Sequence, residues 1–232
     1  MKRLRELCAR WNLPDGAERQ LAGLLKLLAD GRTAPTSVRD PARAVDVHVA
    51  DSLSGLVVLR GRPLLETIVD IGSGAGFPGI PLAVALRVCV DLLEATRRKC
   101  TFLDQTIEML ELDRVRVVCE RAEEWGSGQG REAYDAALIR AVGPLPTLVE
   151  YAAPLLREGG LLVAWKGRRD PAEERAGARA AEVLGLRSLP ALAVEPFAGV
   201  SRRHLHPYEK VAPTPAGYPR RPGVARKRPL GA

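Results

Sequence analysis

From about Thr67 onward the chain alternates between short apolar runs and helix-like stretches, and this alternation restricts the fold more than any other feature. Each apolar run has the length of a strand, and most are followed by a stretch whose apolar residues recur at helical spacing. Strands that alternate with helices form crossover units, which build a mainly parallel sheet with helices on both faces. The sequence therefore predicts a doubly wound α/β fold with a mainly parallel, seven-stranded sheet.

The expected strands and helices follow from these runs. No helix-like stretch separates the last two strands, near 188–194 and 205–212, so these two are expected to pair antiparallel. Strands are expected over 67–72, 88–94, 115–120, 134–141 and 161–167, and helices over 79–88, 95–113, 146–160 and 171–186.

The first 60 residues have a different pattern. Five leucines between positions 21 and 28 supply an apolar helical face that ends at Gly31, and a second helix is expected over 44–59. The loop between them is rich in Pro, Ser, Thr and Asp. We divide the chain into a helical extension (1–60), an α/β domain (61–212) and a Pro- and Arg-rich tail (213–232) that is not expected to be regular.

The basic residues are concentrated at the C-terminal end. The net charge is +7, and the segment from Arg202 onward holds eight basic residues and one acid, Glu209, so the preceding 201 residues balance to zero. A neutral body with a basic tail is expected where the tail meets a polyanion. The alternative is a solvated, disordered terminus, and charge alone does not separate the two.

Several features favour a reduced, cytoplasmic compartment. The charged N-terminus has no apolar core of a secretory signal, and no run approaches the ~20 apolar residues that a membrane span needs. Cysteines occur at positions 8, 89, 100 and 119, without a C-x-x-C pair, and three of them lie in apolar or helix-like runs, where a free cysteine packs as a small apolar side chain.

A glycine-rich loop follows the first predicted strand. The segment TIVDIGSGAGFPG places Gly72, Gly74 and Gly76 between a strand and a helix, where a doubly wound sheet binds its ligand. Glu94 ends the second strand, 22 residues after Gly72, and an acid at this point can accept hydrogen bonds from both hydroxyls of a ribose. This pairing of loop and acid predicts a nucleoside-containing cofactor.

The spacing of the loop indicates which cofactor. It is G-x-G-x-G rather than the dinucleotide pattern G-x-G-x-x-G, and an acid, Asp70, precedes it. S-adenosylmethionine contains adenine and ribose but no phosphate, and Asp70 suits its amino group better than it suits a phosphate. We therefore predict that this loop binds S-adenosylmethionine. The simpler alternative is that the glycines only form a tight strand-to-helix turn.

Residues at two further strand ends fall beside the same loop. Ala122 and Glu123 follow the third strand, where a loop can close on the adenine, and Arg140 ends the fourth. The carboxyl ends of parallel strands meet at one edge of the sheet, so these residues are expected to gather there. Each charge alone is more typical of a solvated surface.

The motifs together resemble the glucose-inhibited division protein B family, whose members methylate small-subunit ribosomal RNA at guanine N7. The N-terminal segment TSVRDPARAVDVHVADSL is similar to the family's signature, with Arg39, Asp40, His48, Asp51 and Ser52 in the expected order. DIGSGAGFPGIPL resembles its cofactor loop and LLEATRRKCTFL its ribose-binding strand. RAEE, IRA, WKG and RRH complete the series, and the resemblance runs over most of the chain.

The resemblance implies a Rossmann-like class I methyltransferase fold and transfer of a methyl group from S-adenosylmethionine to N7 of a guanine in 16S ribosomal RNA. It places Arg140 near the methionine end of the cofactor. Guanine N7 has a free lone pair, so no general base is expected, and proximity and orientation would supply most of the acceleration. The expected cofactor contacts are Asp70, Gly72, Gly74, Gly76, Phe77, Glu94, Ala95, Thr96, Ala122, Glu123 and Arg140.

The expected partner is 16S ribosomal RNA or the small ribosomal subunit, bound by a monomer without a metal or a membrane contact. His48 lies in an apolar helical run and is more typical of a structural histidine than of a ligand. The RNA-binding candidates are Arg39, His48, Arg140, Lys166, Arg168, Arg169, Arg202 and Arg203, each of which alone is more typical of a surface charge.

Three other functions remain open at this point. A small-molecule or protein methyltransferase can use the same fold, because a fold does not fix the substrate. A nicotinamide-dependent oxidoreductase would need the G-x-G-x-x-G spacing that the loop lacks. A non-catalytic RNA-binding protein would have no need of the cofactor residues.

Overall fold

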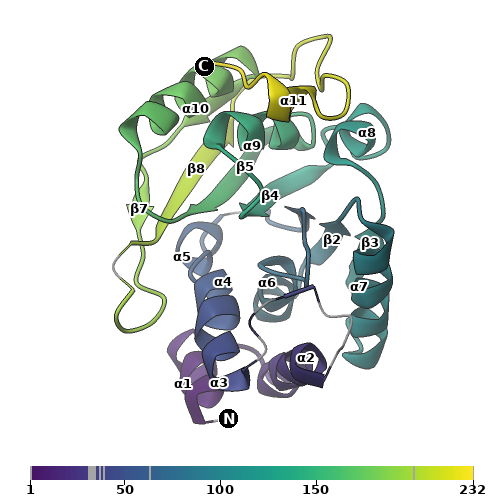
Figure 1. Cartoon of the computed structure of the whole chain (residues 1–232), viewed down its shortest axis with the longest axis vertical. Coiled ribbons are helices and arrows are strands. Elements are labelled where there is room, and N and C mark those ends of the chain that lie inside the picture. The colour runs from purple at the N-terminus through teal and green to yellow at the C-terminus, as the bar shows by residue number, and fades with distance from the viewer. Residues whose placement is uncertain are drawn as a thin grey trace.

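The computed structural model describes residues 2–30, 35–36, 38, 40–62, 64–200 and 202–231. Helices α1 (Lys2–Arg10) and α2 (Ala17–Asp30) are followed by a continuous helical stretch and a short helix. The continuous stretch comprises α3 (Pro41–Ala44), the π-helical turn η1 (Val45–Ala50) and α4 (Asp51–Leu53), and α5 (Leu56–Leu59) comes next. The predicted helical extension is thus confirmed (Figure 1).

The predicted alternation of strands and helices is also confirmed. The structure contains β1 (Thr67–Ile71), α6 (Gly79–Leu86), β2 (Cys89–Leu93), α7 (Arg97–Met109), β3 (Val115–Val118), α8 (Ala122–Ser127), β4 (Tyr134–Arg140), α9 (Leu145–Ala152), β5 (Leu156–Lys166), α10 (Pro171–Val183), β6 (Leu186–Ser188), β7 (Leu192–Ala193), β8 (His204–Lys210) and α11 (Val224–Lys227).

The strands form one sheet in the order β3-β2-β1-β4-β5-β8-β6. The first five are parallel, whereas β8 is antiparallel to β5 and to both β6 and β7. The two short strands β6 and β7 pair with successive parts of β8, so the sheet is seven strands wide although it has eight strands. The order reverses between β1 and β4, which is the switch point where doubly wound sheets bind ligands.

One boundary differs from the prediction. The helix expected over 146–160 ends at Ala152, and β5 begins at Leu156. The register between β4 and β5 shifts after the pair Tyr134–Leu156, and Gly159 has a φ of 80°. A glycine pair inside a strand permits such a bulge, and sequence periodicity alone does not distinguish it from a helix end.

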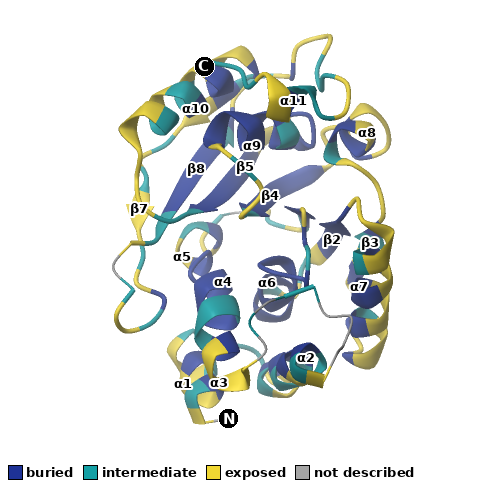
Figure 2. Cartoon of the chain, in the orientation of Figure 1, coloured by how far each residue is buried: buried dark blue, intermediate teal, exposed yellow. Residues whose placement is uncertain are grey.

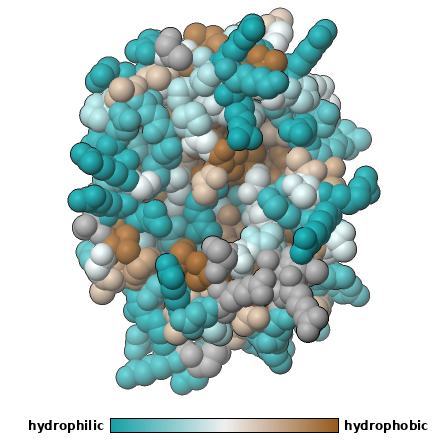
Figure 3. Space-filling model, viewed as in Figure 1, coloured by the Kyte–Doolittle hydropathy of each residue, from teal (hydrophilic) through white to brown (hydrophobic). Residues whose placement is uncertain are grey.

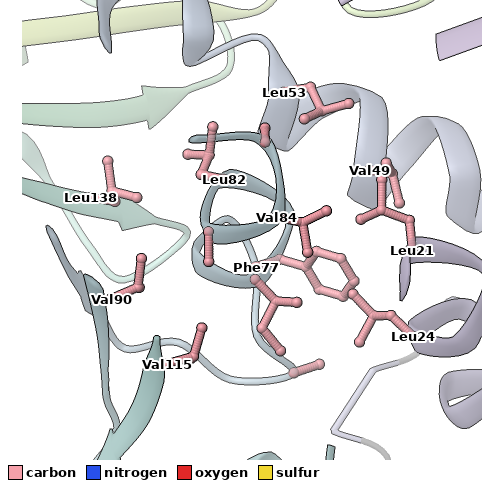
Figure 4. Packing of buried hydrophobic residues seen from close by; sticks show 14 of the residues in the cluster. Leu21, Leu24, Val49, Leu53, Phe77, Leu82, Val84, Val90, Val115 and Leu138 are labelled. Carbon is pink, nitrogen blue, oxygen red and sulfur yellow. The ribbon is translucent and has the colours of Figure 1, made fainter. Parts of the chain in front are cut away.

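Apolar side chains on the two faces of the sheet form two clusters. Figure 2 shows the central strands buried on both faces, as a parallel sheet covered by helices requires. One cluster joins the sheet to α6, α7 and the N-terminal helices, and Figure 4 shows Phe77 beside Leu24 of α2 within it. The other packs the opposite face against α9 and α10. The described residues of the extension therefore share a core with the sheet.

The tail packs against the body, although its described residues outside α11 are irregular, as expected. The alternative of a solvated, disordered terminus is therefore wrong. Tyr218 and Leu230 pack against the second cluster, and α11 lies beside α9 (Figure 1). Arg220 forms a two-point ion pair with the buried Glu150 of α9, with Nε 2.7 Å from Oε1. Composition alone could not reveal these partners, because they lie 70 residues away in the sequence.

The expectation of reduced cysteines is wrong for two of the four. Cys100 in α7 and Cys119 after β3 form a disulfide, with Cα atoms 5.9 Å apart, while Cys8 and Cys89 are free. No C-x-x-C pair marks this bridge, because the two cysteines are 19 residues apart and meet only when β3 pairs with β2.

Candidate active site at the carboxyl edge of the sheet

The glycine loop follows β1 at the switch point of the sheet. Gly72, Gly74 and Gly76 have φ values of 72°, 59° and 91°, which favour glycine. A Cβ at Gly72 would lie 2.8 Å from Val142, and one at Gly76 would lie 2.4 Å from Ile80. A Cβ at Gly74 would meet nothing closer than 3.8 Å, so the loop is open on this side and a ligand can approach its backbone there.

Glu94 lies against this open side. The backbone N–H of Gly74 donates to Oε2 of Glu94 at 3.2 Å, and the N–H of Thr96 donates to Oε1 at 2.8 Å. Lys99 also contacts the carboxylate, with Nζ 3.5 Å from Oε2. Ala95 and Thr96, which follow, are exposed. The carboxylate is therefore fixed beside the loop, where it can accept bonds from ribose hydroxyls.

Asp70 lies at the end of β1 directly before the loop, and its predicted contact with the cofactor stays a prediction. Its side chain is completely buried, and Oδ2 accepts a 2.9 Å hydrogen bond from the N–H of Gly79 at the start of α6. Burial raises the pKa of this carboxyl to about 7. Oδ2 of Asp70 thus links the end of β1 to the first turn of α6, whereas Oδ1 has no hydrogen-bond partner among the described residues.

Ala122 and Glu123 begin α8, at the edge of the sheet predicted for the adenine. Ala122 is half-buried and Glu123 is buried. Oε1 of Glu123 accepts a 2.8 Å hydrogen bond from the backbone N–H of Gly223, so this carboxylate is bonded to the tail. The sequence pointed to the position of Glu123 but not to its partner, 100 residues further along the chain.

Phe77, His48 and Arg140 form a stack between the loop and the helical extension. The rings of His48 and Phe77 are 4.6 Å apart and nearly parallel, and the guanidinium carbon of Arg140 lies 5.6 Å from the Phe77 ring. Burial, and secondarily the charge of Arg140, lowers the pKa of His48 to about 4, so the ring is neutral at pH 7. Nε2 of His48 lies 3.0 Å from Oγ1 of Thr36. These contacts fit the structural role expected of His48.

Asp51 is the important site residue that the site prediction omitted. It is 2% exposed, and Oδ2 accepts a 2.8 Å hydrogen bond from Nη1 of Arg140. Oδ1 lies 3.2 Å from Nε of Arg203 but has no well-aligned hydrogen-bond partner among the described residues. The available signal was the spacing of Asp51, an acid three residues after His48 in a largely apolar helical run, because i and i+3 share one helix face.

These residues line a cavity of about 370 Å³ between the helical extension and the ends of β4 and β5. This volume lies within the ~300–1,000 Å³ range of small-molecule pockets. The wall combines the Asp51 carboxylate with several hydrogen-bond donors and the indole of Trp165. The lining consists of Val47, His48, Asp51, Arg140, Ala141, Gly143, Trp165, Lys166, Gly167 and Arg203.

The RNA-binding candidates separate into paired and exposed groups. Lys166 contacts Glu173 at 2.6 Å and Gly143 O at 3.2 Å, and Arg169 forms a two-point pair with Glu174. Arg168 and Arg202 are exposed near the cavity-lining Gly167 and Arg203. Arg39 lies outside the described residues. The structure thus brings His48, Arg140, Lys166 and Arg203 to one cavity and leaves the other described candidates on its rim or beyond.

Neither a metal centre nor a membrane-spanning segment is present in the part of the chain that the structure describes. Within it, no three His, Cys, Asp or Glu side chains gather closely enough to hold a metal ion. None of its helices is long and apolar enough to cross a membrane. The face in Figure 3 is mostly hydrophilic, with only small apolar patches.

With this geometry in view, comparison with known proteins decides the family. Residues 18–205 match the model of the GidB family, described as rRNA small subunit methyltransferase G. The chain belongs to this family. Its relatives of that name include proteins from Chloroflexus aggregans (42% identical, 97% of this chain and 96% of the relative covered) and Rubrobacter xylanophilus (43% identical, 92% and 85%). The resemblance inferred from the motifs is therefore confirmed.

Solved structures that resemble this rRNA small subunit methyltransferase G family member confirm the predicted fold. A geranyl diphosphate methyltransferase in complex with S-adenosylmethionine aligns with a TM-score of 0.60 at 15% identity, over 80% of this chain and 94% of that one. The TYW2 protein of Pyrococcus horikoshii aligns with a TM-score of 0.52 at 17% identity, over 70% and 62%. At this identity the likeness concerns the Rossmann-like methyltransferase fold alone.

Proposed function

We propose that this chain transfers a methyl group from S-adenosylmethionine to N7 of a guanine in 16S ribosomal RNA, in the cytoplasm and as a monomer. The observation that carries the proposal is the position of the 370 Å³ cavity. The Phe77–His48–Arg140 stack connects two residues of its wall, His48 and Arg140, to the glycine loop, so the cavity would adjoin the proposed cofactor site. Membership of the rRNA small subunit methyltransferase G family supports the choice of reaction and of RNA.

The residues at the loop fit the cofactor. Glu94 would accept hydrogen bonds from the ribose hydroxyls, and the open face at Gly74 leaves room for the nucleoside. Ala122 and Glu123 would lie along the adenine, and Phe77 and Arg140 toward the methionine end. When bound, S-adenosylmethionine supplies the electrophilic methyl group. Gly72, Gly76, Ala95 and Thr96 complete the proposed site.

The cavity suits the acceptor base. A guanine presents N1–H and N2–H donors on one edge and O6 and N7 acceptors on another. The Asp51 carboxylate provides an acceptor deep in the cavity, and Arg140, Lys166 and Arg203 provide donors. A base in this cavity must be extruded from its stack or come from a loop, as enzymes that modify bases require.

The protein's own contribution to the reaction is orientation. Guanine N7 carries a lone pair and no proton at neutral pH, so its attack on a methyl group releases no proton from N7. The neutral His48 therefore has no proton to remove, and it instead holds Phe77 by stacking. Fixing two reactants in line can supply a large part of the rate enhancement.

Cations at the rim of the cavity would contact phosphates. Arg202 is exposed and Arg203 half-buried at the start of β8, and Arg168 and Arg169 lie just after β5. Alanine substitution of Arg202 and Arg203 should weaken binding of a 16S RNA fragment and lower the slope of log K against log salt by ~0.7–0.9 per lost phosphate contact. Affinity for S-adenosylmethionine should remain unchanged.

Arg187→Ala is the matched control, because Arg187 is an exposed arginine on β6 that pairs with Glu209. Its salt slope should equal that of the wild type. An unchanged slope in the Arg202/Arg203 double variant would contradict phosphate binding at this rim. A small-molecule or protein substrate on the same fold would then become the better interpretation.

A further inference from the structure

The C-terminal tail is anchored to the body at both of its ends. At its beginning, the buried Lys210 donates to the carbonyl of Ala153 at 2.8 Å and contacts Oγ1 of Thr214, which also donates to Ala153. At its end, Nε of Arg179 in α10 donates to the carbonyl of Gly231 at 3.0 Å. Residues 214–231 therefore cross the α8–α9–α10 layer as a fixed strap.

The middle of this strap contacts the two helices next to the cofactor edge. The N–H of Gly223 donates to Glu123 in the first turn of α8, and Oγ1 of Thr147 in α9 donates to the carbonyl of Ala225 at 3.2 Å. Glu123 and Thr147 are 5% and 1% exposed. The Thr147–Ala225 bond is buried and the Gly223–Glu123 bond is partly buried. Shielded hydrogen bonds fix the relative position of the segments they join more strongly than exposed ones.

Arg220 holds the strap in this position. Its guanidinium pairs at two points with Glu150, which is 1% exposed, and Nη2 also donates to the carbonyl of Arg228 at 2.9 Å. The same side chain thus ties together both sides of the turn that carries Gly223. Gly223 itself has a φ of 81°, a backbone conformation that other residues rarely adopt. In this conformation its N–H points to Glu123.

We propose that the C-terminal tail is a positioning element of the cofactor site, which fixes the first turn of α8 against the adenine through the Gly223–Glu123 bond. This inference rests on the proposed placement of the adenine beside Ala122 and Glu123. Adenine affinity and selectivity, and not only the stability of the fold, depend on the contacts of residues 220–225. Arg220 and Gly223 act through Glu123 and do not touch the cofactor.

The test uses the full chain with Arg220→Met, which keeps an apolar side chain but removes the pairing with Glu150. The matched control is Arg116→Met, because Arg116 likewise pairs at two points with a buried acid, Asp91 in β2. The pair lies beside a cavity lined by the first residues of β1 and β2, away from the loop. Binding of S-adenosylhomocysteine and of its hypoxanthine analogue is measured by calorimetry, well below each melting temperature.

The expected result for Arg220→Met is ~2- to 10-fold weaker binding of S-adenosylhomocysteine, the range that loss of one hydrogen bond gives. Selectivity over the hypoxanthine analogue should fall with it. Arg116→Met should lose thermal stability and keep wild-type affinity and selectivity. If Arg220→Met also keeps both, the tail has only a structural role and the inference is wrong.

A second variant covers the case in which Arg220→Met does not fold. Gly223→Ala adds a methyl group with no atom within 4 Å, so it changes only the backbone preference at that position. Like Arg220→Met, it should weaken the binding of S-adenosylhomocysteine, and unchanged binding would overturn the inference. A wild-type chain that does not bind S-adenosylhomocysteine would instead overturn the proposed cofactor site, and the tail inference with it.

Discussion

Arg140, at the end of β4, donates a 2.8 Å hydrogen bond to the buried carboxylate of Asp51 in the helical extension. This ion pair joins the extension to the strand edge that carries the cofactor loop. Removing one partner of a buried pair leaves an uncompensated charge, which typically costs ~3–5 kcal/mol.

We therefore expect Asp51→Ala to lower the free energy of unfolding by ~3–5 kcal/mol and to abolish methyl transfer. Urea unfolding and single-turnover methylation measure the two effects. Asp46→Ala, which breaks a partly exposed pair with Arg3 one turn earlier, is the control and should cost no more than ~1 kcal/mol. Equal losses in the two variants would show that Asp51 has no special role.

Asp70 gives the fold a predictable dependence on pH. Its pKa is raised to about 7 by burial, above the ordinary value of 3.8, so the folded chain binds more protons than the unfolded chain between these values. The free energy of unfolding should therefore fall as pH rises from 4 to 7. Asp70→Asn keeps an acceptor for Gly79 and should remove this slope, with a gain of about 2–4 kcal/mol at pH 8. A slope that survives in the variant would contradict this assignment.

His48 should remain neutral throughout the physiological range. Because burial and Arg140 lower its pKa to about 4, the imidazole C–H resonances should not titrate between pH 5 and 8. The stability that the neutral ring contributes is present above pH 6.5 and is lost as pH falls toward 4. Proton NMR of the full chain, with His48→Phe to assign the signal, tests this, and a midpoint near 6.5 would show that the ring is solvated.

Reduction of the Cys100–Cys119 disulfide should destabilise the fold. The bridge closes a loop with a sequence separation of 19, for which the chain-entropy model gives ~3 kcal/mol. Thermal unfolding with and without dithiothreitol should show this difference in the wild type and none in Cys100→Ser. If dithiothreitol leaves the wild-type transition unchanged, the two thiols are not paired in solution.

The sequence was sufficient for those parts of the fold that depend on local patterns. The alternation of apolar runs located all the parallel strands, and the glycines with Glu94 located the loop, because turn geometry and strand length are local properties. The boundary at Leu156 was missed, because a glycine bulge in a strand and a glycine after a helix have the same local pattern.

The site was only partly predictable, because its decisive contacts are long-range. Asp51 meets Arg140 across 89 residues, and Glu123 meets Gly223 across 100. Whether Asp70 points to a ligand or to the helix behind it depends on one side-chain direction at a strand end, which periodicity does not resolve. Composition predicted that the tail is irregular, and it could not show where the tail packs, because the partners Glu150 and Thr147 lie on a helix elsewhere in the chain.

The most direct test of the proposed function is transfer of labelled methyl groups from S-adenosylmethionine to unmethylated small ribosomal subunits and to naked 16S ribosomal RNA. Gly74→Asp is the control, because Gly74 has a φ of 59°, which Asp tolerates, and its side chain would enter the open face beside Glu94. We predict label at N7 of a guanine with the wild type and none with the variant. Wild-type protein that binds S-adenosylmethionine but labels neither RNA substrate would contradict the proposed function.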